Sequence, residues 1–335
     1  MFRLLLLLLP VVLLSFTLPV FALPESALEN GGWVKTLSPF LASGRSIEFT
    51  GEDGLNLQGI RFTRLKPIAT LVFLPGFSEP WLKYIELLHD LHQQGYEILS
   101  YDHRGQGSSP RLAPGNPDAV HLVKFEDHVS DLGRFLIASG ADNFHLLGHS
   151  MGGAVALSWA ETRTPPPAMR ILVNAPMLAI RTDPFPRPLA HLLASLLTGI
   201  GFGEHYAPTK GPRDPDRPFE LNHGTSSRIR YGFEQTLSRQ FPDRWVGGPT
   251  NSWVKTALDA SGRIARDASR IRNPVGMLVP SDDHYAVPKE LFGICHDLGR
   301  LCKAIPLEGS RHEVFVESDP YRSAAITAVL ESLKN

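Results

Sequence analysis

The sequence predicts an α/β protein with a mostly parallel central sheet and helices on both faces. Three observations support this fold class. Several short runs are continuously apolar rather than alternating, which is typical of strands buried on both faces. Segments with helical spacing of apolar residues stand between these runs. The chain has 335 residues, enough for one large core.

The first 22 residues have the pattern of a secretory signal peptide. Arg3 is the only early charge, a long apolar run follows it, and "VFA" ends at Ala22 with the small residues that a signal peptidase reads. The alternative is an uncleaved membrane anchor, because about 20 apolar residues can span a bilayer. Both interpretations predict an exported protein, which is periplasmic or secreted if cleaved and membrane-anchored if not. Residues 23–45 form a lead-in to the first strand.

The predicted core covers residues 46–178 and 272–335. Its first elements are a hairpin around Gly51 and Gly54 and a series of buried strands that alternate with helices. In chain order they are the hairpin (46–63), strand (68–80), helix (81–95), strand with a glycine-rich loop (96–109), helix (125–140), strand (143–150), helix (151–163), strands (169–178, 274–283 and 302–313) and closing helix (319–335).

Residues 179–271 interrupt this rhythm, because they contain no clear buried strand and are rich in Pro, Gly, Arg and aromatic residues. Two segments have the pattern of amphipathic helices, 188–200 and 253–271, although Gly262 weakens the second. The insertion lies between two sheet strands. We therefore expect a helical cap or lid over the carboxyl edge of the sheet, where open α/β sheets bind ligands.

Composition excludes some classes of function. The net charge is −1, so no nucleic acid or anionic surface is implied as a partner. No histidine or cysteine pair has the spacing of a zinc site, and we expect neither a metal nor an organic cofactor. The two cysteines, Cys295 and Cys302, form either one disulfide or two reduced thiols, since spacing alone does not settle their geometry.

The strongest chemical signal is the G-x-S-x-G pattern "GHSMG" centred on Ser150. It stands between a predicted strand and a predicted helix, which places the serine on a sharp turn with its hydroxyl exposed. Gly148 and Gly152 leave room for the strand and the helix to approach. The pattern therefore predicts a nucleophilic serine at the N-terminus of a helix.

A serine nucleophile requires a base, and His312 follows the last predicted strand, where the chain order serine, acid, histidine places the base. The acid belongs after the preceding strand, where Asp282 and Asp283 stand together. We favour Asp283 because it lies deeper in the loop. This carboxylate would orient the imidazole and stabilise its cation.

Two backbone N–H groups are candidates for an oxyanion hole, which acyl transfer requires. One belongs to Met151, directly after the serine. The other belongs to Phe77, in the loop "LPGFSE" after an early strand, where Gly76 lets the backbone turn closely.

These motifs together resemble the bacterial lysophospholipase and monoacylglycerol lipase branch of the α/β-hydrolases, from about Ser46 to the C-terminus. The matching stretches are "PGFSEPWLKY" (75–84), "YDHRGQGSS" (101–109), "GHSMGG" (148–153), "NAPML" (174–178), "FELNHGTSSRIRYGF" (219–233), "GGPTNSWV" (247–254) and "GSRHE" (309–313). The sequence departs from the family at Pro75-Gly76, where His-Gly is frequent. It also departs at the acid loop, where a gapless match reaches His284 and a shift of one residue is needed to use Asp283.

The resemblance implies a serine esterase that cleaves the carboxylic ester of a lysophospholipid or a monoacylglycerol through an acyl-enzyme. Trp245, Trp253 and the apolar helix of the insertion suit an acyl chain and allow contact with a membrane surface. Arg104 and His149 are interpreted as structural. The alternatives are a broad-specificity esterase or peptidase on the same fold, and a non-catalytic lipid-binding protein. The oligomeric state stays open.

Overall fold

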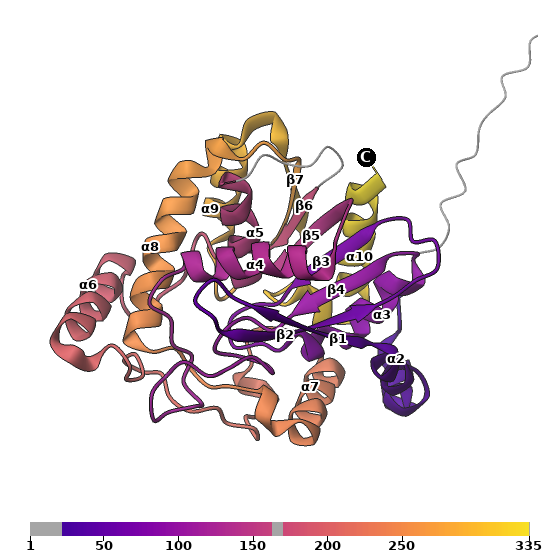
Figure 1. The fold of residues 1–335 in the computed structure, drawn as a ribbon, viewed down its shortest axis with the longest axis horizontal. Coiled ribbons are helices and arrows are strands. Elements are labelled where there is room, and N and C mark those ends of the chain that lie inside the picture. The colour runs from indigo at the N-terminus through magenta and orange to yellow at the C-terminus, as the bar shows by residue number, and fades with distance from the viewer. Residues whose placement is uncertain (1–21, 163–169, 335) are drawn as a thin grey trace, which may run out of the picture.

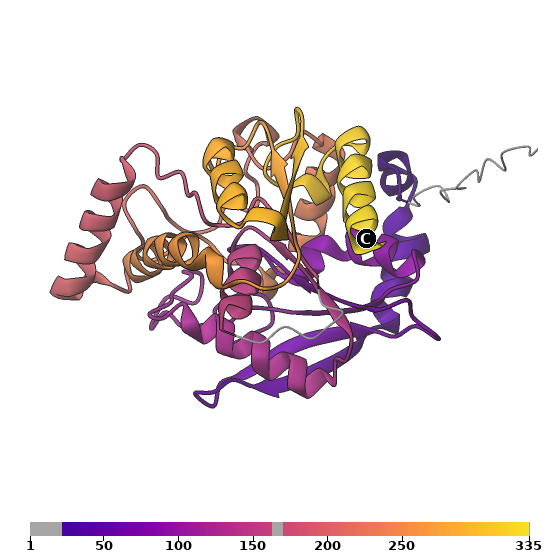
Figure 2. The same cartoon turned by 90° about the horizontal axis from the view of Figure 1, so that it is seen from above.

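The computed structural model describes residues 22–162 and 170–334, and these form a single sheet of eight strands with helices on both faces (Figure 1, Figure 2). The predicted signal peptide lies outside the described residues except for Ala22. Residues 163–169, which include the end of the predicted helix 151–163 and the start of the predicted strand 169–178, also lie outside the described residues.

The strands run in the order β1-β2-β4-β3-β5-β6-β7-β8 across the sheet. β1 and β2 form an antiparallel hairpin, β2 pairs with β4 in antiparallel fashion, and all other neighbours are parallel. The predicted fold class is thereby confirmed. Bounds are β1 (Arg45–Thr50), β2 (Asn56–Phe62), β3 (Thr70–Leu74), β4 (Glu97–Tyr101), β5 (Phe144–His149), β6 (Ile171–Asn174), β7 (Val275–Pro280) and β8 (Cys302–Leu307).

The strands differ in burial according to their position in the sheet. Every residue of β3, β4, β5, β6 and β7 is buried, as their continuous apolar runs predicted. The two edge strands, β1 and β8, are mostly half-exposed or exposed. The parallel centre of the sheet therefore lies in the core, and its carboxyl edge carries the loops that follow β3, β5, β7 and β8.

Two apolar clusters lie on the two faces of the sheet. The first receives side chains from α4 (Glu126–Ser139), α5 (Met151–Glu161), α8 (Asn251–Asp267) and α9 (Pro288–Asp297). The second receives side chains from α2 (Ser38–Ser43), α3 (Ile85–Gln93), α7 (Arg228–Gln240) and α10 (Asp319–Lys334). A short helix, α1 (Glu25–Glu29), precedes α2. The 23–45 stretch thus packs against the second face.

The residues between β6 and β7 contain α6 (Arg187–Leu197), α7 and α8. Figures 1 and 2 both show α6 projecting away from the body, with α8 between it and the core. α6 and α8 agree with the two amphipathic segments of the sequence, and Gly262 lies inside α8 without interrupting it. α7 was not predicted, because it is polar on most positions and Leu237 is its one fully buried aliphatic residue.

Cys295 of α9 and Cys302 of β8 form a disulfide, which decides between the two alternatives that their spacing left open. Within the described part of the chain, no helix is long and apolar enough to cross a membrane.

Candidate active site

Ser150 occupies the turn between β5 and α5 with a backbone φ of +48°, a value that L-residues rarely adopt. Three hydrogen bonds hold this turn: the Ser150 N–H donates to the Asn174 carbonyl at 2.9 Å, and its carbonyl accepts from the N–H groups of Ala154 (3.1 Å) and Met177 (3.0 Å). A Cβ atom on Gly152 would lie 2.2 Å from the Leu74 carbonyl oxygen. The glycine is therefore required for α5 to approach β3.

The structure brings His312 and Asp283 together at the carboxyl edge of the sheet. His312 Nδ1 lies 2.8 Å from Asp283 Oδ2, while Asp283 Oδ1 accepts from the N–H groups of Tyr285 (2.7 Å) and Ala286 (2.9 Å). Both oxygens of this buried carboxylate are thus occupied. Asp282 is exposed and its carboxylate faces His284 and Arg311 instead.

Electrostatics couple the two side chains of this pair. Burial alone would lower the pKa of His312, but the charge and hydrogen bond of Asp283 outweigh burial and raise it above its usual value. Burial would likewise raise the pKa of Asp283, and the His312 charge, with several hydrogen bonds, holds it below the usual value. The pair therefore favours a carboxylate beside an imidazole that accepts a proton readily.

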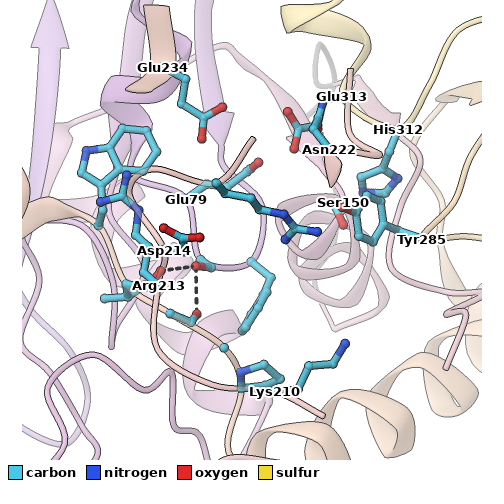
Figure 3. Close-up of a pocket in the computed structure, with 18 of the residues that line it drawn as sticks. Glu79, Ser150, Lys210, Arg213, Asp214, Asn222, Glu234, Tyr285, His312 and Glu313 are labelled. Carbon is cyan, nitrogen blue, oxygen red and sulfur yellow. Dashed lines mark hydrogen bonds between the residues drawn. The ribbon is translucent and has the colours of Figure 1, made fainter. Parts of the chain in front are cut away.

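Asn174, the last residue of β6, connects the serine turn to the histidine loop. Its Nδ2 donates to the His312 carbonyl at 2.9 Å and lies 2.8 Å from His149 Nδ1. The rings of His149 and His312 are 4.9 Å apart. Ser150 and His312 line the same pocket, and Figure 3 shows them together at one side of it, beside Tyr285.

The loop after β3 presents Phe77 to this pocket. The N–H of Gly76 donates to Glu79 Oε2 (2.8 Å) and that of Ser78 donates to Gln106 Oε1 (3.0 Å). The Phe77 N–H between them has no acceptor in the described part of the chain. Met151 N–H is at the first position of α5, where helix N–H groups have no intrahelical acceptor. Both candidate oxyanion donors thus lie beside the pocket with unused N–H groups.

The pocket has a volume of about 720 Å³. Its apolar lining includes Phe77, whose ring lies 4.1 Å from that of Trp253, together with Met177, Ile180 and Trp245. A smaller apolar cavity of about 160 Å³ between α6 and α8 shares Trp253 and Ile180 with it. The two tryptophans that the sequence pointed to therefore do line the pocket above the serine.

Charged residues line another part of the same pocket (Figure 3). The acidic residues are Glu79, Asp214, Glu234 and Glu313, and the basic residues are Arg181, Lys210, Arg213 and Arg217. His312 stands next to Glu313 in the chain. The Arg213 guanidinium lies 5.0 Å from the centre of the Trp245 ring. The cavity thus combines an apolar wall with groups of both charges.

Lys83 is a site residue that sequence reasoning missed. Its buried ammonium lies 2.8 Å from Glu79, 2.9 Å from Glu313 and 3.4 Å from Glu234. Burial opposes a charge on Glu79, but the charge of Lys83 outweighs burial and lowers the pKa of Glu79 to about 2. For Glu313 burial is the larger effect, and it raises the pKa of that carboxyl to about 7. Lys83 thereby connects the loop of Phe77 to the loop of His312. The i,i+4 spacing of Glu79 and Lys83 could have predicted that ion pair. Nothing in the sequence indicates that Glu234 and Glu313, from distant segments, also contact Lys83.

Arg104 and His149 make contacts of the kind expected for residues with a structural role. Arg104 donates to Asp131 (2.7 Å) and Asp53 (2.9 Å) and does not line the pocket. His149 is buried, and burial lowers its pKa to about 3, so that its ring is neutral. No group of three or more His, Cys, Asp or Glu residues in the described ranges could hold a metal ion.

Known proteins resemble this chain over most of its length. A family model described as serine aminopeptidase, S33 matches residues 65–319. Lysophospholipase L2 of Escherichia coli (strain K12) is 31% identical over 320 residues, which cover 90% of this chain and 92% of that protein. A probable lysophospholipase L2 of Haemophilus influenzae is 28% identical, over 77% of this chain and 82% of that protein.

Solved structures share the fold. The crystal structure of Paleococcus ferrophilus monoacylglycerol lipase has a TM-score of 0.63 and 21% identity, covering 83% of this chain and 98% of that one. A soluble variant of monoglyceride lipase from Saccharomyces cerevisiae has a TM-score of 0.65 and 17% identity, covering 86% and 94%.

Proposed function

This chain belongs to the α/β-hydrolases of the serine aminopeptidase S33 family, in the branch of the lysophospholipases and monoacylglycerol lipases, and we propose that it cleaves single-chain lipid esters through a serine acyl-enzyme. It is a carboxylic ester hydrolase, similar to lysophospholipase L2 over nine tenths of its length. The observation that carries the mechanism is the 2.8 Å contact of His312 with Asp283 in the pocket that Ser150 lines.

In this mechanism His312 Nε2 takes the proton of the Ser150 hydroxyl while the serine oxygen attacks the ester carbonyl carbon. The imidazolium then gives that proton to the glycerol oxygen as the ester bond breaks, which leaves an acyl-serine. Water then gives a proton to His312 as its oxygen attacks the acyl carbon. The imidazolium returns that proton to the Ser150 oxygen as the acyl–serine bond breaks, which releases the fatty acid and restores the enzyme. Asp283 keeps the imidazole oriented throughout and stabilises its cation.

The tetrahedral intermediates carry a negative oxygen, and the N–H groups of Phe77 and Met151 are the proposed donors to it. Support comes from their unused N–H groups at the pocket and from the ionic contacts of Lys83 that hold the Phe77 loop. Donors held before the reaction cost no reorganisation when charge develops.

The lining of the pocket supports a lysophospholipid as the first candidate substrate. Its apolar wall and the adjoining cavity suit an acyl chain. Arg213, Arg217 and Lys210 suit a phosphate, because guanidinium and ammonium groups form charge-assisted hydrogen bonds with it. A monoacylglycerol has no such charge and is the second candidate, favoured by the same apolar wall.

We also propose that the protein is exported and meets a lipid surface through α6. Leu189, Leu192 and Leu196 recur at helical spacing on α6 and are all exposed, as are Ile200 and Phe202 beyond its end. An exposed apolar face of this size marks an interaction surface. Because α6 borders the cavity next to the pocket, contact there would bring lipid to the site.

A fluorophosphonate probe tests the nucleophile, and an ester series tests the substrate. We expect a single adduct on Ser150 by mass spectrometry and release of fatty acid from lysophosphatidylcholine at a higher rate than from monooleoylglycerol. Preference for short acyl chains would instead indicate a broad esterase, and cleavage of an aminoacyl arylamide a peptidase. No adduct and no release would favour a lipid-binding protein.

A further inference from the structure

The first residues after Ala22 are built into a buried ionic cluster rather than lying on the surface. Leu23 is 7% exposed, and its backbone N lies 3.2 Å from Asp90 Oδ2. The Leu23 carbonyl accepts from Arg230 Nη2 at 2.9 Å. Two residues on, the Glu25 N–H lies within 3.1 Å of both carboxylate oxygens of Asp319. The chain at Leu23 is thus held at both its N–H and its carbonyl.

The anchor cluster, as we call it, joins three helices through Glu86 and Asp90 of α3, Arg230 of α7, and Asp319 and Arg322 of α10. Arg230 lies 3.0 Å from Glu86 and 2.8 Å from Asp319, and Arg322 lies 2.7 Å from Asp90 and 3.3 Å from Glu86. Both arginines, Glu86 and Asp90 are almost wholly buried.

The charges of this cluster do not balance. The buried charges pair two to two, Arg230 and Arg322 with Glu86 and Asp90. The carboxylates of Asp319 and Glu25, whose side chains are 40% and 20% exposed, add further negative charge at the rim of the cluster. His89 Nδ1 lies 3.2 Å from the other oxygen of Asp90. Arg322 already pairs with Asp90, but the cluster as a whole carries more carboxylates than guanidinium groups. A cation in place of the neutral Leu23 N–H would therefore strengthen the contact with Asp90, because charge-assisted hydrogen bonds are the stronger ones.

Hydrolysis of the Ala22–Leu23 peptide bond would supply that cation at this point. The C–N bond breaks, water gives its hydroxyl to the Ala22 carbonyl carbon and a proton to the Leu23 nitrogen, and the resulting amine is protonated at neutral pH. We propose that the α-ammonium group of Leu23, created by cleavage after Ala22, docks on buried Asp90 and locks the mature N-terminus between α3, α7 and α10. This inference rests on the proposed export and is independent of the proposed hydrolysis.

The lock would also stabilise the catalytic pocket. Arg230 is in the first turn of α7, and the same helix carries Tyr231 and Glu234, which line the pocket. α3 follows directly on the short helix that carries Lys83, the partner of Glu234. The docked N-terminus therefore braces one wall of the pocket against the core.

The test uses the full chain, exported and purified, with its N-terminus read by intact mass. The matched variant carries Gly-Ser inserted between Ala22 and Leu23, so that Leu23 keeps an amide nitrogen after processing. We expect the natural mature chain to begin at Leu23 and to have a melting temperature at least about 2–4 °C above that of the variant. A different mature N-terminus, or equal melting temperatures, would overturn the proposal.

Two carboxylate substitutions distinguish the ammonium contact from a steric effect of the insertion. In an Asp90→Asn background the natural and inserted chains should melt at the same temperature. In an Asp319→Asn background the difference should persist, because Asp319 contacts the Glu25 N–H and not Leu23. Persistence of the difference with Asp90→Asn would refute the contact.

Amine acetylation provides a readout that needs no substitution in the cluster. Under native conditions the Leu23 amine should resist acetic anhydride while exposed lysines react, and it should react once the protein is unfolded. The inserted chain should acetylate at its new glycine without unfolding. Rapid native acetylation of Leu23 would show that its amine is not docked and would contradict the proposal.

Discussion

The carboxyl edge of the sheet and the α6 end of the insertion are built in opposite ways. At the sheet edge, Asn174 of β6 forms hydrogen bonds with the backbone of both Ser150 and His312. Asp283 accepts hydrogen bonds from backbone N–H groups of its own loop. At the far end, α6 packs on α8 and exposes Leu189, Leu192 and Leu196. The contrast teaches that the groups proposed for chemistry are preorganised by the core, whereas the surface proposed to meet lipid is unpartnered.

The insertion itself contains one helix that is held to the core and one that is largely exposed. α7 is tied to the core through Arg230, which contacts Glu86 at 3.0 Å and the Glu317 carbonyl at 2.6 Å. α6 has no comparable buried ion pair among the described residues; its Arg187 pairs with Glu290 where both are partly exposed. Variants at the sheet edge should therefore affect all substrates alike, and variants on α6 should affect dispersed lipid alone.

Ser150→Ala tests the sheet edge most severely. We expect kcat to fall by a factor on the order of 10⁶ for both micellar lysophospholipid and a soluble short-chain ester, because the nucleophile is lost. Circular dichroism should show an unchanged fold. A variant that kept activity on either substrate would place the chemistry elsewhere.

Asp283→Asn should lower kcat by about 10⁴-fold on both substrates, because the amide no longer holds the imidazole in the required tautomer. Asp282→Asn is the matched control, since its carboxylate is exposed and faces His284. The control should retain activity within about twofold of the unsubstituted enzyme. The reverse ranking would make Asp282 the acid.

Leu192→Asp with Leu196→Asp should sharpen the contrast between the two regions. Loss of apolar contact with lipid should lower the rate on micelles or vesicles at least tenfold, since withdrawing even one of the two leucines from an apolar environment costs about 1.5–3 kcal/mol and about 1.4 kcal/mol is a factor of ten. The soluble ester should be cleaved at an unchanged rate. Leu65→Asp is the control, because Leu65 is 90% exposed and lies in the loop before β3. That loop is at the amino edge of the parallel strands, opposite the carboxyl edge that carries Ser150. A loss on the soluble ester as well would point to a defect in folding.

The pH dependence reports on the sheet edge alone. The base must be neutral to take the serine proton, and the Asp283 charge raises the pKa of His312 against the opposing effect of burial. The acid limb of kcat/KM should therefore lie above pH 6.5, so that the rate at pH 6.5 is less than half of its plateau. In Asp283→Asn the limb should move to lower pH. The same limb is expected for soluble and dispersed substrates, and an α6 variant should leave it in place.

Removal of the disulfide should have the smallest effect on activity. Cys295→Ser with Cys302→Ser opens a loop whose ends are 7 residues apart, and the chain-entropy model gives a loss of about 2 kcal/mol in the free energy of unfolding. Denaturant unfolding measures this loss. Rates on both substrates should change by less than about twofold. A larger fall in rate would mean that the disulfide positions the His312 loop after β8.

Local signals made much of this architecture predictable. The continuous apolar runs of β3 and β5, the hairpin at Gly51 and Gly54, and the glycines around Ser150 act within a few residues of chain. The lead-in was less readable, since nothing in residues 23–45 indicates that Leu23 is buried. α7 escaped prediction because its amphipathic pattern is weak and its contacts are ionic.

By itself, the sequence determined the alternation of buried strands and helices in the core and the strand-serine-helix turn, because backbone conformation there depends on neighbouring side chains and on glycines that no other residue could replace. Only the tertiary structure decided that Asp283 rather than Asp282 meets His312, that Lys83 gathers Glu79, Glu234 and Glu313, and that Cys295 pairs with Cys302. Apart from Glu79 with Lys83 and the two cysteines, these contacts join segments that are far apart in the sequence, and such a separation carries no information about distance. Their energy depends on burial and on charges that become neighbours only when the chain is folded.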